Sequence, residues 1–171
     1  MQYNIHPIVV HFPIALLFIY SILKILPVHR WFPTVAWKQI QNTFLFFGVA
    51  FAFLATSTGE LAKELTGPLE SLVEMHERFA NITVWVYGLL IAGEVIKFLE
   101  NRLINKINVS WIREILIKIG NLLTNKKLSG VLAFIGLVAI TTTGLLGGVM
   151  VYGLSADPFA ETVLKILGID F

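Results

Sequence analysis

Histidine is the residue type in this sequence that is best suited to chemistry, since the chain contains four histidines and no cysteine. The lack of cysteine excludes disulfides, thiolate metal sites, iron–sulfur clusters and covalently attached c-type haem. Imidazole remains available as a ligand for haem or metal ions. His6 and His11 lie in "NIHPIVVHFPIA" and His76 lies in "MHERFA". These segments can form a cofactor site if the fold brings them together.

The spacing of the first two histidines predicts different roles for them. Five residues along a helix turn through about 140° and rise about 7.5 Å, so His6 and His11 do not share a face. Pro13 removes the hydrogen bond to the Val9 carbonyl and is expected to loosen the first turns. We predict that His11, about 6 Å inside the helix mouth, is the inward ligand and that His6 is its surface neighbour. Anchoring of helix ends is the alternative role for both.

A pair formed by His11 and His76 favours axial ligation of haem b. Bundle cytochromes hold this group between two imidazoles from different helices. Small residues are needed beside the cofactor, and "TTTGLLGGVMVYG" supplies Gly147 and Gly148 with Tyr152 nearby. Glycines of this kind equally serve close helix packing, and Gly144 with Gly148 forms a motif that also permits oligomers.

A bare metal ion is the alternative cofactor. His6, His11 and His76 with Glu60 or Glu77 would suit Zn, Cu or non-haem Fe.

Three polar positions are interpreted more simply. Ala80 stands where an HExxH metalloprotease helix needs its second histidine, so that motif is excluded. Glu77 is expected in the first turn of a helix, where the helix dipole favours an acid. Glu94 is expected to pair with nearby Lys97.

Composition and hydropathy indicate the elements that must position these residues. The chain of 171 residues is 56% hydrophobic and 14% charged, with a mean hydropathy of +0.78. A soluble domain has about 25% charged residues. Four apolar runs reach the length of about 20 residues that a membrane helix needs, at about 7–26, 43–62, 82–99 and 128–153. We predict a single all-α domain, an integral membrane four-helix bundle, whose first helix is retained because no cleavage site follows it.

Two amphipathic helices are expected outside the spans. Apolar residues recur every three or four positions at about 109–123, with Arg113, Glu114 and Lys118 between them, which is typical of a helix lying in the membrane interface. The tail is expected to form another helix, capped by Asp157 with Pro158 at its first position.

The distribution of lysine and arginine predicts the orientation. Ten of the 13 fall on one side, mostly in the long loop before the fourth span. The positive-inside rule places that basic loop in the cytoplasm and both termini outside, in a prokaryotic inner membrane. The cytoplasmic helix is expected to meet the lipid bilayer rather than nucleic acid. His6, His11, Glu60, His76 and Tyr152 then gather at the outer face, while His29 falls in a cytoplasmic loop.

The segments "HPIVVHFPIAL", "TGELA", "MHERFANIT" and "TGLLGGVMVYG", in this order, resemble the domain-of-unknown-function 2231 family of predicted membrane proteins. The resemblance covers the chain from His6 to about Gly153, and the first segment is its most specific part. It implies a four-helix membrane fold that is distantly similar to b-type haem bundle cytochromes, and an association with respiratory or redox proteins. The matching positions are His6, Pro7, His11, Pro13, Gly59, His76, Gly147, Gly148 and Tyr152.

One departure from the family pattern concerns the end of the fourth span. In the family a histidine often follows the tyrosine of the last motif by about two residues, whereas Gly153 and Leu154 follow Tyr152 here. This departure argues against two haems.

Three functions are therefore expected from the sequence, in decreasing order. The first is a b-type haem protein that passes electrons between the quinone pool and an outer-face redox partner. The second is a membrane protein that binds a Zn, Cu or Fe ion without redox chemistry. The third is a structural or assembly subunit.

Overall fold

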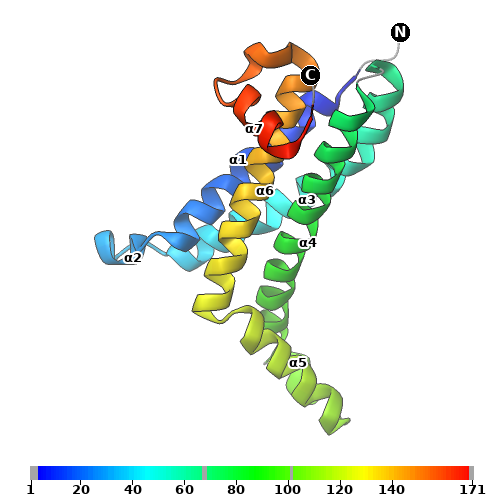
Figure 1. Cartoon of the computed structure of the whole chain (residues 1–171). Helices are drawn as coiled ribbons and strands as arrows, with labels where there is room; N and C mark the ends of the chain where they lie inside the picture. Colours follow the sequence, from blue (N-terminus) through cyan, green and yellow to red (C-terminus); the bar gives the residue numbers. More distant parts are fainter. Residues whose placement is uncertain (1–3, 67–68, 101, 170–171) are drawn as a thin grey trace.

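The chain is helical throughout the described residues 4–66, 69–100 and 102–169 of the computed structural model, and these ranges contain no strand. Four long helices make up most of the molecule (Figure 1). They are α1 (His6–Ile25), α3 (Trp37–Thr66), α4 (Glu70–Glu100) and α6 (Lys126–Tyr152). The shorter helices are α2 (Val28–Trp31), α5 (Ser110–Leu123), α7 (Ala160–Leu167) and the 3₁₀ turns η1 (Ile104–Lys106) and η2 (Gly153–Ala156).

The four long helices are long and apolar enough to cross a membrane, which confirms the predicted all-α four-helix architecture. Between 22% and 28% of the most apolar window of each helix is buried inside the protein. The remaining surface of these windows is available to lipid, in which helices satisfy their own backbone hydrogen bonds. α3 and α4 extend well beyond the predicted spans, since the polar segments at their ends continue the helix.

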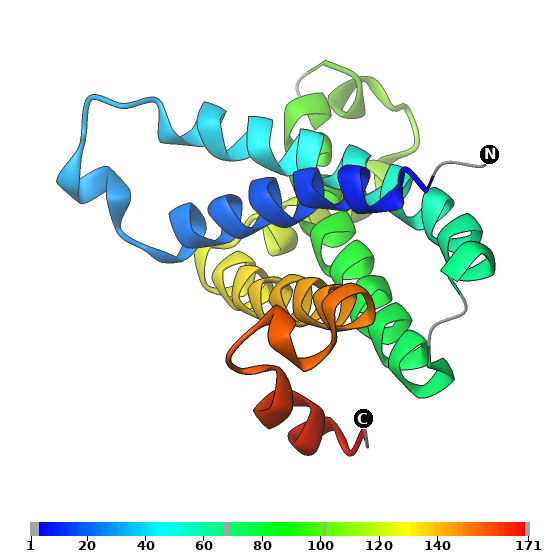
Figure 2. The same ribbon diagram turned by 90° about the horizontal axis from the view of Figure 1, so that it is seen from above.

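The long helices pack as two crossing pairs, α1 with α3 and α4 with α6, and α1 also contacts α6 (Figures 1 and 2). Tyr87 of α4 lies at their centre, where its ring meets the edge of the Tyr20 ring. Its hydroxyl lies 2.7 Å from Ser21 Oγ. Gly136 of α6 makes room for this ring, since a Cβ there would lie 2.7 Å from it. The core of the bundle therefore depends on a tyrosine–glycine contact with a satisfied polar group.

The C-terminal helix α7 folds back onto α6. The chain reverses at Gly153, whose φ of 66° is a conformation that favours glycine. Leu164 of α7 then packs with Leu72 of α4 and Leu146 of α6 in a second apolar cluster. The helix begins at Ala160 rather than at Pro158 as predicted. Asp157 forms a turn before it, in which a side-chain oxygen accepts a hydrogen bond from the Phe159 amide.

The amphipathic helix predicted before the fourth span is present as α5. It runs antiparallel to the end of α4, where Gly120 contacts Ile96 and Gly93 contacts Leu123. Lys97 Nζ donates a hydrogen bond to Asn121 Oδ1 at 2.9 Å. One face of α5 is thus fixed against α4, and its far end projects from the bundle (Figure 1).

Candidate functional site

Two histidines meet helix backbones at one end of the bundle, which we call the histidine end and define by His6, Thr58, His76 and Thr143. These residues belong to α1, α3, α4 and α6 respectively. The opposite end, which carries α2, α5 and ten of the lysines and arginines, is called the basic end. The predicted convergence of separated histidine segments is therefore present, although with a different member of the first pair.

His6 is the first residue of α1, and its ring packs on α3. Its Nδ1 lies 2.9 Å from Thr58 Oγ1, and the Thr58 hydroxyl in turn donates to the Ala55 carbonyl. Because that hydroxyl proton is already used, Nδ1 of His6 is the donor in the contact. A methyl group at Gly59 would lie 3.5 Å from the imidazole, so glycine allows the ring to approach the helix closely.

His76 lies in α4 and packs on α6 in a similar way. Its Nδ1 lies 3.0 Å from the Thr143 carbonyl oxygen, which can only accept, so Nδ1 carries the proton. A methyl group at Gly147 would lie 3.4 Å from the ring. This contact explains the place of Gly147 in the "TGLLGGVMVYG" segment.

The two imidazoles therefore share a chemical state. In each neutral ring a proton on Nδ1 leaves a lone pair on Nε2, which makes no hydrogen bond to the described part of the chain. The rings are also close enough for the charge of His6 to act on His76. A hydrogen bond at one ring nitrogen fixes the orientation of the ring and increases the ligand strength of the other nitrogen. The pair is thus prepared to bind a cofactor through Nε2.

His11 lies outside this arrangement, so the prediction that it faces inward and that His6 lies at the surface is wrong. The His11 side chain is exposed, and its Nδ1 donates to the carbonyl of Pro7 in its own helix. His6 is instead only partly exposed and is held by α3. α1 remains a continuous helix through Pro13, so the loosening expected there does not turn His11 into the bundle.

One signal in the sequence identifies the inward histidine. Pro13, Tyr20 and Ser21 are buried residues of α1, and their positions lie within about 60° of His6 around the helix axis. His11 is about 140° away from His6. Polar side chains in membrane helices face the protein interior, so the shared face of Tyr20 and Ser21 points to His6.

The other predicted site residues lie apart from the pair. Gly148 faces Ala156, Tyr152 is 71% exposed, and Glu60 is exposed on α3. Glu77 lies in the third turn of α4 rather than in its first, because the helix begins at Glu70, and it pairs with Lys63 at 3.3 Å.

Carboxylates therefore do not complete a metal site here. No group of three or more histidine, aspartate or glutamate side chains that could hold a metal ion occurs among the residues described.

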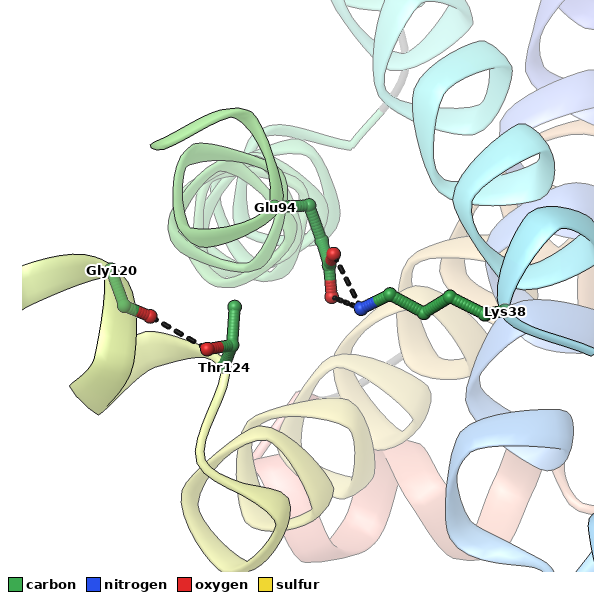
Figure 3. Close-up of polar contacts among 4 residues, drawn as sticks. All are labelled: Lys38, Glu94, Gly120 and Thr124. Carbon is green, nitrogen blue, oxygen red and sulfur yellow. Dashed lines mark hydrogen bonds and ion pairs between the residues drawn. The ribbon is translucent and has the colours of Figure 1, made fainter. Parts of the chain in front are cut away.

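The basic end contains an ion pair that the sequence did not predict. Glu94 of α4 contacts Lys38 of α3 at 2.6 Å through both carboxylate oxygens, while Lys97 pairs with Glu100 (Figure 3). The expected local pair of Glu94 and Lys97 is thus wrong, because Glu94 faces α3. Its side chain is only 13% exposed, whereas that of Lys38 is 60% exposed.

A cavity of about 370 Å³ lies on another face of α6. Its lining includes Thr142, Gly144, Gly148, Asp157 and Phe159, and it includes neither His6 nor His76. It is formed where α7 and the preceding turn cover α6 only in part.

Comparison of the chain with known proteins gives no match to a family model, to a curated protein or to a solved structure. The geometry of the histidine end is therefore the basis for a functional conclusion.

Proposed function

We propose that His6 and His76 are the axial ligands of a b-type haem and that the protein transfers electrons within the membrane. The observation that supports this proposal is the shared state of the two rings, each with Nδ1 bonded to a neighbouring helix and Nε2 free. Two imidazoles from different helices are the donor set of haem in bundle cytochromes. The donor chemistry and the adjacent Gly59 and Gly147 fit this group.

The number of ligands favours haem over a bare metal ion. A zinc site normally needs three or four protein ligands, whereas haem supplies four nitrogen ligands of its own. The described residues bring two imidazoles together without a third acidic or imidazole partner. A Zn, Cu or Fe ion held by Glu60 and the histidines is the less favoured alternative.

The chain contributes orientation and an apolar environment to this function. The bonds from Nδ1 to Thr58 and to Thr143 hold the rings and strengthen Nε2 as a ligand. Bound haem supplies one-electron redox chemistry. With the basic end in the cytoplasm by the positive-inside rule, the pair lies near the outer face of a prokaryotic inner membrane. A membrane quinone and an outer-face redox protein are the partners that this position suits.

A reduced-minus-oxidised visible spectrum of the purified protein tests the proposal. We expect a sharp haem α band, which His6→Ala and His76→Ala each abolish while far-UV circular dichroism keeps its helical signal. His11→Ala and His29→Ala are matched controls, since both side chains are exposed, and they should retain the band. Absence of the band in the parent protein, or its full retention in either ligand variant, would overturn the assignment.

A further inference from the structure

Helix α5 carries an apolar stripe that no other element covers. Trp111, Ile115, Ile119 and Leu122 are all exposed, with Trp111 at 63% and Leu122 at 60%. Their spacings of four, four and three residues place them within about 80° around the helix axis. A contiguous exposed apolar surface of this kind marks an interaction site.

The stripe cannot turn inward, because the other side of α5 is already occupied. Gly120 of α5 meets Ile96, and a Cβ at Gly120 would lie 2.6 Å from that side chain. Asn121 accepts a hydrogen bond from Lys97 of α4. The rotation of α5 is thus set by α4, and the stripe faces away from the protein.

The charge around the stripe is strongly positive. The basic end holds ten lysines and arginines against three glutamates, and two of these, Glu94 and Glu100, already form ion pairs with Lys38 and Lys97. Lys118 lies about 20° from Trp111 around α5. This charge pattern complements a negatively charged partner.

Two of these cations stand where the fold itself disfavours them. Lys126 and Lys127 occupy the first turn of α6, where the helix dipole makes positive charge unfavourable. The side chain of Asn125 caps this helix by accepting from the backbone amides of Lys127 and Leu128, so the lysines are not needed to start it. An external anion gives these two lysines a role that folding does not.

We propose that the basic end binds anionic phospholipids of the bilayer. The stripe of α5 lies among their acyl chains, and Lys118, Lys126 and Lys127 contact their phosphates. An apolar stripe beside cations is the arrangement by which interfacial helices select anionic lipid. Exposed Trp31 and Phe32 at α2 extend the aromatic surface of the same end. This site is independent of the histidine pair.

Tryptophan quenching tests where the stripe lies. The full protein is placed in nanodiscs of phosphatidylcholine that contain either brominated phosphatidylglycerol or brominated phosphatidylcholine at equal mole fraction. The difference in signal between the parent protein and Trp111→Phe isolates Trp111 from the other tryptophans. We expect quenching by the anionic bromolipid to be at least about twofold stronger at low salt, and to approach equality at about 1 M salt. Equal quenching at low salt, or no quenching of Trp111 by either lipid, would overturn the proposal.

A pair of charge variants tests the lysines. Lys118→Gln/Lys126→Gln/Lys127→Gln should abolish the preference of Trp111 for the anionic bromolipid. Lys63→Gln/Arg78→Gln/Lys165→Gln removes the same charge from exposed cations away from the basic end and should keep the preference. If both variants lose it equally, net charge rather than this site is responsible, and the proposal is wrong. Retention in the first variant also overturns it.

Discussion

The two ends of the bundle hold their polar groups by different means. At the histidine end, uncharged rings lie against glycines and donate to Thr58 and to the Thr143 carbonyl. At the basic end, Glu94 and Lys38 join two helices through an ion pair, and unpaired cations surround an apolar helix face. The first end depends on shape and the second on charge.

The difference shows how one membrane protein can fix polar groups at two levels of solvation. A ring that contacts a backbone needs close approach, which only glycine permits. An ion pair needs a counter-ion within reach, and its strength depends on how well water is excluded. The predictions below separate these two requirements.

The largest effect is expected from a change of shape at the histidine end. Gly147→Leu places a side chain where the His76 ring lies, 3.4 Å from the position of a Cβ, and displaces the ring. We expect haem content, measured by the pyridine haemochrome spectrum, to fall at least about tenfold. Gly130→Leu is the control in the same helix, because a Cβ at Gly130 has no neighbour within 4 Å. Equal haem content in both variants would contradict the role of Gly147.

A change of charge at the basic end should have the next largest effect. Lys38→Met leaves the Glu94 carboxylate, 13% exposed, without its ion pair. We expect the free energy of unfolding to fall by about 2 kcal/mol, less than for a fully buried pair because Lys38 is partly solvated. Unfolding in mixed micelles of increasing denaturing detergent measures it.

The control for this variant is Arg78→Met, which breaks an exposed pair with Glu74 at 2.7 Å. It should cost less than about 0.5 kcal/mol. If the two variants unfold at the same detergent fraction, the Glu94 pair does not connect α3 and α4 energetically.

A smaller effect is expected between the two ends, at the centre of the bundle. Ser21→Ala removes the 2.7 Å hydrogen bond to Tyr87, whose hydroxyl keeps the Leu17 carbonyl at 3.3 Å. Hydrogen bonds between membrane helices contribute about 0.6 kcal/mol on average, and we expect a loss of that size in the same unfolding assay. Ser57→Ala is the control, since Ser57 is exposed and bonds only within its own helix. A loss of several kcal/mol would make Ser21 a determinant of the fold.

The smallest effect concerns an ion pair in the C-terminal helix α7. Lys165 lowers the pKa of the exposed Glu161 carboxyl through a hydrogen bond and its charge. The pair therefore contributes stability above the ordinary pKa of glutamate, and this contribution is lost as the pH falls through the lowered pKa. In Lys165→Met the pKa, measured by carboxyl ¹³C NMR titration, should rise towards its ordinary value with almost no change in unfolding. An unchanged pKa would mean that the contact is not formed in solution.

Hydropathy predicted the four long helices, because membrane helices are defined by length and composition alone. The polar extensions of α3 and α4 escaped this criterion, since hydropathy detects the spans and not the helix beyond them. The pairing of Glu94 with Lys38 also required knowledge of which face of α4 meets α3. Sequence spacing gave only the local alternative of Lys97.

The histidine pair was predicted in part. The approach of the first segment to His76 followed from topology, whereas the choice between His6 and His11 required the packed face of α1. That face was visible in the positions of Tyr20 and Ser21, which align with His6. Depth in the membrane was the wrong criterion, because His11 satisfies its Nδ1 on its own helix and needs no contact with another.

The unequal lengths of the helices connect the histidine pair to the bilayer itself. α1 has 20 residues and α4 has 31, which correspond to about 30 Å and about 46 Å. The hydrocarbon core is about 30 Å thick, so it matches an upright α1 but not an upright α4, which must tilt or project into water. His6 belongs to the short helix and His76 to the long one. Hydrophobic mismatch in thinner or thicker bilayers would therefore change the crossing of these helices and the separation of the two imidazoles.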